Sequence, residues 1–77
     1  MPTFNFRERS IEDYDKAIEL DPNDAAAYYN RGDSYGDLGQ YQRSIEDYDK
    51  ALELGPNDAE ARTLRQRALR ALEESAK

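Results

Sequence analysis

A protein of 77 residues with a formal net charge of −6 has room for one domain, and it contains no cysteine and no histidine. The two absences exclude disulfides, thiolate chemistry, the usual zinc ligands and the commonest general base. The acidic balance argues against a nucleic-acid partner, because such proteins normally carry a basic stripe.

The sequence has neither a long apolar run nor the regions of a secretory signal at its start. We therefore expect no membrane span and a cytoplasmic location. Charge is uneven along the chain, since residues 1–58 carry a net charge of −8 and residues 59–77 carry +2. A solvated surface is the simpler interpretation of this basic end, and an electrostatic contact is the alternative. Its arginines are Arg62, Arg65, Arg67 and Arg70.

One segment occurs twice, at a spacing of 34 residues. Residues 10–25 read SIEDYDKAIELDPNDA and residues 44–59 read SIEDYDKALELGPNDA, so only two of sixteen positions differ. Self-similarity at a period of this length is typical of stacked repeats, in which one unit cannot bury its apolar face without a neighbour. The period therefore predicts a repeat architecture.

The first predicted helix covers about residues 7–20, after a lead-in at residues 1–6 that has no helical period. Its apolar residues recur at intervals of three and four, which places them on one helix face. Pro22 ends this helix, and Asn23 and Asp24 can cap the next one. The apolar face consists of Ile11, Tyr14, Ala17 and Ile18.

The second predicted helix runs from Asp24 or Ala25 to Asp37 or Leu38. Its buried face consists of Tyr28, Gly32, Tyr35 and Leu38. A glycine inside a helix costs about 0.5–1 kcal/mol relative to alanine, so Gly32 indicates that a neighbouring helix needs the space.

Two further helices complete the pattern, which predicts an all-α antiparallel stack of about four helices. The third begins at Tyr41 and ends before Pro56, with Ile45, Tyr48, Ala51 and Leu52 on its buried face. The last runs from about Asn57 to Glu74 and has a narrower apolar stripe, typical of a terminal helix with one face in water. The stripe consists of Ala61, Leu64, Ala68, Leu69 and Leu72.

The repeated unit resembles the tetratricopeptide repeat (TPR) family, whose period is 34 residues. Tyrosines replace the usual tryptophan and phenylalanine of the family pattern, and Ser44 replaces a small alanine. Arg31 stands in place of the usual leucine, where it can lay its stem along the core and hold its charge outside. The positions that match the pattern are Tyr28, Gly32, Tyr35, Ser44, Tyr48, Ala51 and Pro56.

The resemblance implies a right-handed superhelical fragment in one TPR-like domain, residues 1–77. Residues 25–58 would form one full repeat, and residues 7–24 the second helix of a partial repeat. Residues 59–77 resemble a capping helix, because the family's aromatic, leucine and glycine are replaced there. The replacing residues are Arg62, Arg65 and Gln66.

The resemblance also implies a non-catalytic protein–protein interaction module whose first-type helices line a concave groove. The groove candidates are Ala26, Tyr29, Asn30, Asp33, Gly36 and Asp37, continued by Glu60, Thr63, Leu64, Arg67 and Arg70. Asn30 matches an asparagine of the members that bind chaperone tails, but the accompanying basic residue is missing, so we do not expect that ligand. Tyr29, Asp33 and Asp37 favour a basic or aromatic peptide, and a solubilising surface without a ligand is the alternative.

One and a half repeats are fewer than the roughly three that an independent stack usually needs. The face of Ile11, Tyr14 and Ile18 would be covered by Phe4 and Phe6, by another copy of the chain, or by the rest of a longer array. The near-identity of the two copies also fits an engineered, consensus-like sequence that assembles without a ligand. We favour a homo-oligomer, because the basic last helix could meet the acidic first helix of a neighbour.

The sequence offers no nucleophile–base pair, no metal-binding constellation and no phosphate-binding glycine loop. We therefore expect neither an enzyme nor a cofactor. The predicted partners are proteins or peptides, with no nucleic acid and no membrane.

Overall fold

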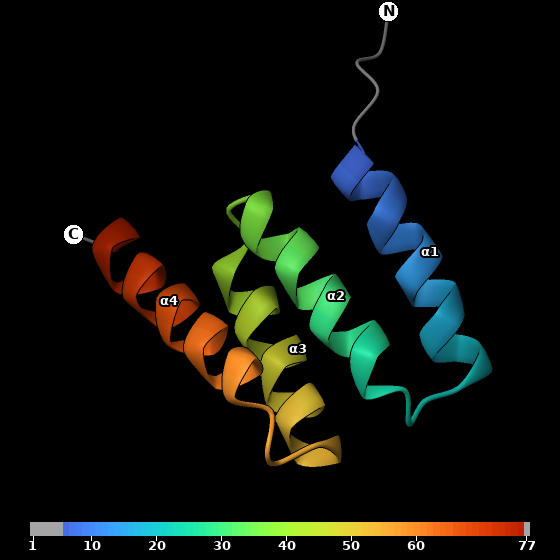
Figure 1. Cartoon of the computed structure of the whole chain (residues 1–77). Helices are drawn as coiled ribbons and strands as arrows, with labels where there is room; N and C mark the ends of the chain where they lie inside the picture. The colour runs from blue at the N-terminus through green and yellow to red at the C-terminus, as the bar shows by residue number, and fades with distance from the viewer. Residues whose placement is uncertain (1–5, 77) are drawn as a thin grey trace, which may run out of the picture.

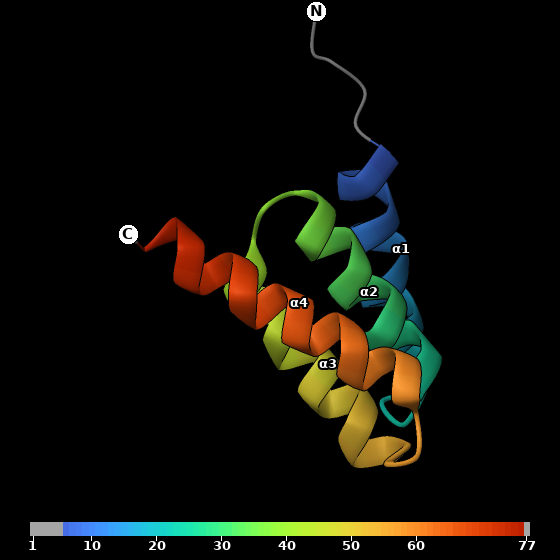
Figure 2. The same cartoon turned by 60° about the vertical axis from the view of Figure 1, so that its left-hand side comes forward.

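The computed structural model of the chain describes residues 6–76, and the side chains of residues 8–76. These residues form four helices and no strand, which confirms the all-α prediction. The helices are α1 (Phe6–Leu20), α2 (Ala25–Asp37), α3 (Tyr41–Leu54) and α4 (Ala59–Ser75). Successive helices run antiparallel (Figure 1), and α4 lies across α2 and α3 (Figure 2).

The helix ends follow local signals in the sequence. The Asp24 side chain accepts a hydrogen bond from the backbone N–H of Ala27 at 3.2 Å, and the Asp58 side chain accepts one from Ala61 at 3.0 Å. Such N-caps typically contribute about 1 kcal/mol, so the Pro-Asn-Asp turn starts a helix in each copy of the repeat. The first helix begins at residue 6, one residue earlier than predicted.

Gly32 brings α2 and α3 into close contact, as predicted. A Cβ atom at this position would lie 3.1 Å from two ring carbons of Tyr48 and 3.2 Å from the Cβ of Asp47. The Ser44 hydroxyl donates a hydrogen bond of 2.7 Å to the Gly32 carbonyl. Gly39 has a positive φ of 77° and makes the turn that leads into α3.

The core lies between α2, α3 and α4. Ile45, Tyr48 and Ala68 form its centre, and partly buried Tyr29, Leu64, Leu69 and Leu72 pack against them. No side chain of α1 that the structure describes is fully buried, and its predicted apolar face is only half-buried. The core is therefore asymmetric along the row of helices.

Arg31 links three helices, which corrects the expectation that its charge points outward. Its guanidinium donates to both carboxylate oxygens of Asp47 on α3, at 2.9 and 2.7 Å, and to Asp15 on α1 at 2.8 Å. The Asp47 side chain is only 7% exposed. The guanidinium also lies 5.6 Å from the ring centre of Tyr28. The hydrogen bonds to Asp47 raise the pKa of Arg31 above its already high ordinary value.

Candidate functional site

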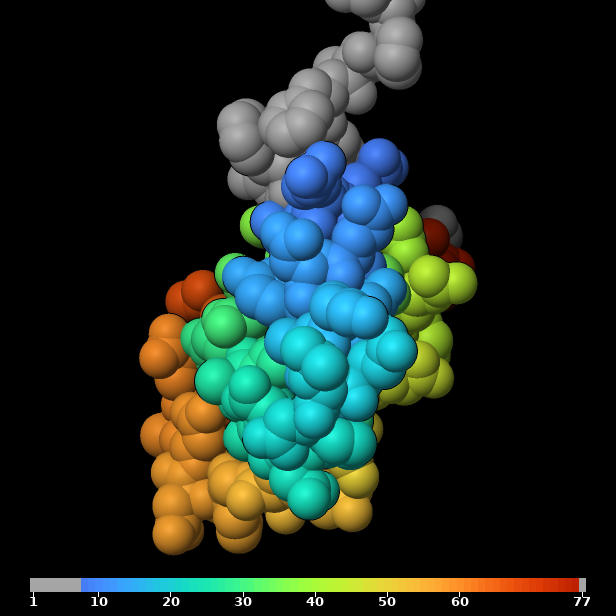
Figure 3. Space-filling model, turned by 90° about the vertical axis from the view of Figure 1, so that its right-hand side faces the viewer, coloured from blue at the N-terminus to red at the C-terminus, as the bar shows by residue number. Residues whose placement is uncertain are grey.

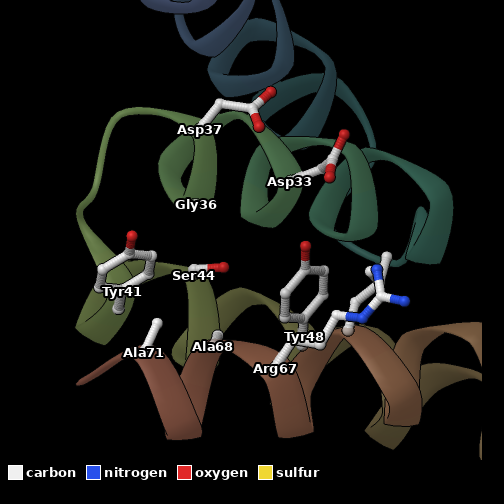
Figure 4. Close-up of a pocket in the computed structure, with 10 residues that line it drawn as sticks. Asp33, Gly36, Asp37, Tyr41, Ser44, Tyr48, Arg67, Ala68 and Ala71 are labelled. Carbon is white, nitrogen blue, oxygen red and sulfur yellow. The ribbon is translucent and has the colours of Figure 1, made fainter. Parts of the chain in front are cut away.

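A hollow of about 290 Å³ lies between α2, α3 and α4 (Figure 4). Each helix supplies one wall, so the site exists only once the three helices are packed. We call it the central hollow. Its lining residues are Asp33, Gly36, Asp37, Tyr41, Ser44, Tyr48, Leu64, Arg67, Ala68 and Ala71.

The α2 wall of the central hollow is acidic. Asp33 and Asp37 are four residues apart, which places both carboxylates on one face of the helix. Gly36 lies between them in sequence and has no side chain. A Cβ atom at this position would lie 3.4 Å from the Ser44 hydroxyl. The hydroxyl ends of Tyr41 and Tyr48 point toward this acidic wall (Figure 4).

The α3 wall is aromatic. Tyr48 is buried, and its ring meets the Tyr29 ring edge-on, with centres 5.9 Å apart and an interplanar angle of 61°. Burial raises the pKa of Tyr48, and the charges of Asp33 and Asp37 raise it further. A hydrogen bond with Ser44 acts in the opposite direction and lowers the pKa of Tyr48.

The α4 wall is apolar apart from one arginine. Leu64, Ala68 and Ala71 line it, and Arg67 stands at the rim opposite the acidic wall. The hollow thus carries opposite charges on its two outer walls, with small and aromatic side chains between them. Tyr48 and Ser44 of α3 lie between these two walls (Figure 4).

Further hollows lie on the part of the chain that the structure describes. A hollow of about 550 Å³ lies on the outer face of α4, lined by Ala59, Arg62, Thr63, Gln66, Arg67 and Arg70. One of about 240 Å³ lies at the start of α2, lined by Ala25, Ala26, Tyr29, Asp58 and Glu60. Burial and a hydrogen bond with Glu60 raise the pKa of Tyr29.

The structure divides the predicted groove residues among these three hollows. Asp33, Gly36, Asp37, Leu64 and Arg67 meet in the central hollow. Ala26, Tyr29 and Glu60 lie at the start of α2, and Thr63 and Arg70 lie on the outer face of α4. Asn30 lines none of the three.

The contribution of α3 to the site was not predicted from the sequence. Tyr48 was predicted to lie in the core, whereas Tyr41, Ser44 and Tyr48 also line the central hollow. Their spacing of three and four residues places them on one helix face, which was the available signal. Ala71 was missed because it lies in the C-terminal part of α4, beyond the predicted groove positions.

The predicted self-association residues lie at the α1 end. Ile11, Tyr14 and Ile18 are half-buried. Phe4 lies outside the described residues, as does the side chain of Phe6.

No group of three or more aspartate or glutamate side chains among the described residues could hold a metal ion. None of the helices that these residues form is both long and apolar enough to cross a membrane.

Comparison with protein families identifies the fold. A model described as a tetratricopeptide repeat matches residues 25–58, and one described as a TPR repeat matches residues 8–39. A search of curated proteins gives no match. Such repeats are generally protein–protein interaction modules and typically non-catalytic scaffolds. The matches cover the paired helices, the repeated N-caps and the glycine contact described above, and the chain belongs to the tetratricopeptide repeat family.

Proposed function

We propose that this chain binds a protein partner by taking up an extended peptide segment in the central hollow, with a lysine or arginine side chain beside Asp33 and Asp37. The observation that carries this proposal is the pair of carboxylates on one wall of a hollow with an aromatic floor. In this proposal residues 25–58 act as the binding repeat, and residues 59–77 close its far side.

Charge and shape both favour a basic side chain. The negative potential that raises the pKa of Tyr48 would stabilise a cation at the same place. An aliphatic stem could lie along the rings of Tyr41 and Tyr48 while its charged end reaches the carboxylates. Arg67, on the opposite wall, can donate hydrogen bonds to a peptide carbonyl or to a neighbouring acidic residue.

The first test compares peptides that differ only in charge. Calorimetry or fluorescence anisotropy with lysine-containing, alanine-containing and glutamate-containing versions of one peptide should give binding only with lysine, and weaker binding as salt rises. Equal retention of the glutamate version would contradict the proposal.

The matched variants locate the binding. Asp33→Asn together with Asp37→Asn should weaken lysine-peptide binding about tenfold or more, because both charges face the proposed cation. Glu12→Gln together with Glu46→Gln removes the same charge from exposed positions that do not line the hollow. If both double variants weaken binding equally, the effect comes from net charge and not from this site.

Self-association is a second candidate function, favoured by the half-buried face of Ile11, Tyr14 and Ile18 on α1. In this second candidate, the role of the chain would be structural assembly without any peptide ligand. Molar mass measured against protein concentration, with helicity followed in parallel, tests it directly. A cooperatively folded monomer at high micromolar concentration would reject it.

A further inference from the structure

The first and third helices contain the same eight residues, SIEDYDKA, at positions 10–17 and 44–51. In α3, the exposed fractions of Ser44, Asp47, Tyr48 and Ala51 are 1%, 5%, 3% and 2%. In α1, the counterparts of the serine, tyrosine and alanine are only half-buried, and the counterpart of the aspartate, Asp13, is exposed. The same sequence is therefore buried in one helix and only partly covered in the other.

The covered copy shows what this sequence binds. Asp47 pairs with Arg31 through both carboxylate oxygens, and the Ser44 hydroxyl donates to the Gly32 carbonyl. The ring of Tyr48 lies where a side chain at position 32 would come too close. The complement is thus a helix with an arginine followed directly by a residue that leaves room for a tyrosine ring. Among the described helices, none packs on α1 in the way that α2 packs on α3. Instead, α1 lies at the surface of the molecule (Figure 3).

The fourth helix carries the matching arginine. Arg65 lies 34 residues after Arg31, and each pairs with the aspartate 16 residues before it, Asp49 and Asp15 respectively. Therefore α4 sits on α3 as α2 sits on α1. Arg31 makes a second pair with Asp47, whereas Arg65 makes only the first pair among the described residues.

The charges of the two ends are complementary. The outer face of α4 has a hollow of about 550 Å³ whose lining includes Arg62, Arg67 and Arg70. The exposed residues of α1 include Glu12, Asp13 and Glu19. A basic surface and an acidic surface at opposite ends of one molecule favour contact between copies and disfavour contact between like ends.

We propose that a second copy of this chain docks head to tail, with its α1 on the outer face of α4, so that Arg65 pairs with Asp13 of the second copy as Arg31 pairs with Asp47. This proposal rests on the self-association offered above as a second candidate. Such a contact joins two different surfaces and leaves both ends available, so assembly continues beyond a dimer unless a ring closes.

Gln66 sets the strength of this contact. It occupies the position that corresponds to Gly32, where even a Cβ atom would lie 3.1 Å from the tyrosine ring. In the docked pair, Gln66 would meet Tyr14 of the second copy and hold the two helices further apart than α2 and α3. The association is therefore weak and reversible, and a smaller residue at this position strengthens it.

The proposed register places Arg65 opposite Asp13 of the second copy. Light scattering over a wide concentration range, with helicity measured on the same samples, tests it. The weight-average mass should rise past that of a dimer as the concentration increases. Gln66→Ala, which keeps a good helix former, should shift this rise to lower concentration. Asp13→Asn should shift it about tenfold or more to higher concentration, because Arg65 loses its second partner.

Glu12→Gln is the matched control, since it removes one charge from the neighbouring exposed position. It should shift the rise much less than Asp13→Asn. Equal shifts, or a mass that stops at a dimer, would overturn the proposed register while leaving self-association in place. A monomer at every concentration, for both the unaltered chain and Gln66→Ala, would overturn self-association altogether. Peptide binding in the central hollow is tested separately, with the double variant of Asp33 and Asp37, so that failure of one proposal does not decide the other.

Discussion

At the scale of single residues, the stability of this fold depends on one arginine with two partners of unequal burial. The Asp47 side chain is 7% exposed and the Asp15 side chain is 52% exposed. The ion pair of Arg31 with the buried Asp47 and its ion pair with the exposed Asp15 contribute differently to stability, because water screens the exposed pair more strongly. The two aspartates therefore provide an internal comparison.

Asp47→Ala should lower the free energy of unfolding by about 2–4 kcal/mol, because it leaves the largely buried guanidinium of Arg31 without its main partner. Asp15→Ala should lower it by less than about 1 kcal/mol. Urea unfolding followed by helicity measures both values. Equal effects of the two substitutions would contradict the role assigned to burial.

The same arginine shows why part of the fold was beyond sequence analysis. Helix positions, the N-cap at Asp24 and the close contact at Gly32 follow from local spacing, and these predictions are confirmed. The pairing of Arg31 with Asp47 joins residues 16 positions apart, and a helical pattern assigns both charges to the solvent. Polar residues that are buried through pairing carry no periodic signal, so only the packed structure reveals them.

At the scale of helices, small residues determine how closely α2 packs on α3. Gly32 admits the ring of Tyr48, and the Ser44 hydroxyl reaches the Gly32 carbonyl. The central hollow depends on this contact, because Tyr48 and Ser44 form part of its lining. Its acidic wall was predictable from the spacing of Asp33 and Asp37, whereas its α3 wall depends on how closely the two helices approach.

Gly32→Ala should therefore destabilise the protein by about 1–3 kcal/mol, despite the better helix propensity of alanine, because the new methyl group overpacks against Tyr48 and Asp47. Gly36→Ala is the matched substitution in the same helix, and its Cβ would meet only the Ser44 hydroxyl at 3.4 Å. It should be neutral or stabilising by up to about 1 kcal/mol. Thermal and urea unfolding of both variants distinguish overpacking from propensity.

At the scale of the whole molecule, stability is distributed unevenly along the row of helices. The core lies between α2, α3 and α4, whereas α1 contributes no fully buried side chain among those described. Local opening requires less free energy where few apolar contacts must be broken. The helix that contains the same octapeptide, α3, should open only when the core itself opens.

Amide hydrogen exchange at low protein concentration should thus show faster exchange in residues 10–17 than in residues 44–51, although the two octapeptides are identical in sequence. Intrinsic propensity within the two octapeptides is the same, so a difference must come from their surroundings, of which burial is the one that the structure shows to differ. Raising the concentration should slow exchange in residues 10–17 selectively if a second copy covers α1, since docking adds to α1 the cover that α2 gives to α3. Equal exchange in both segments at low concentration would mean that the contact with α2 alone stabilises α1 as fully as two neighbours stabilise α3.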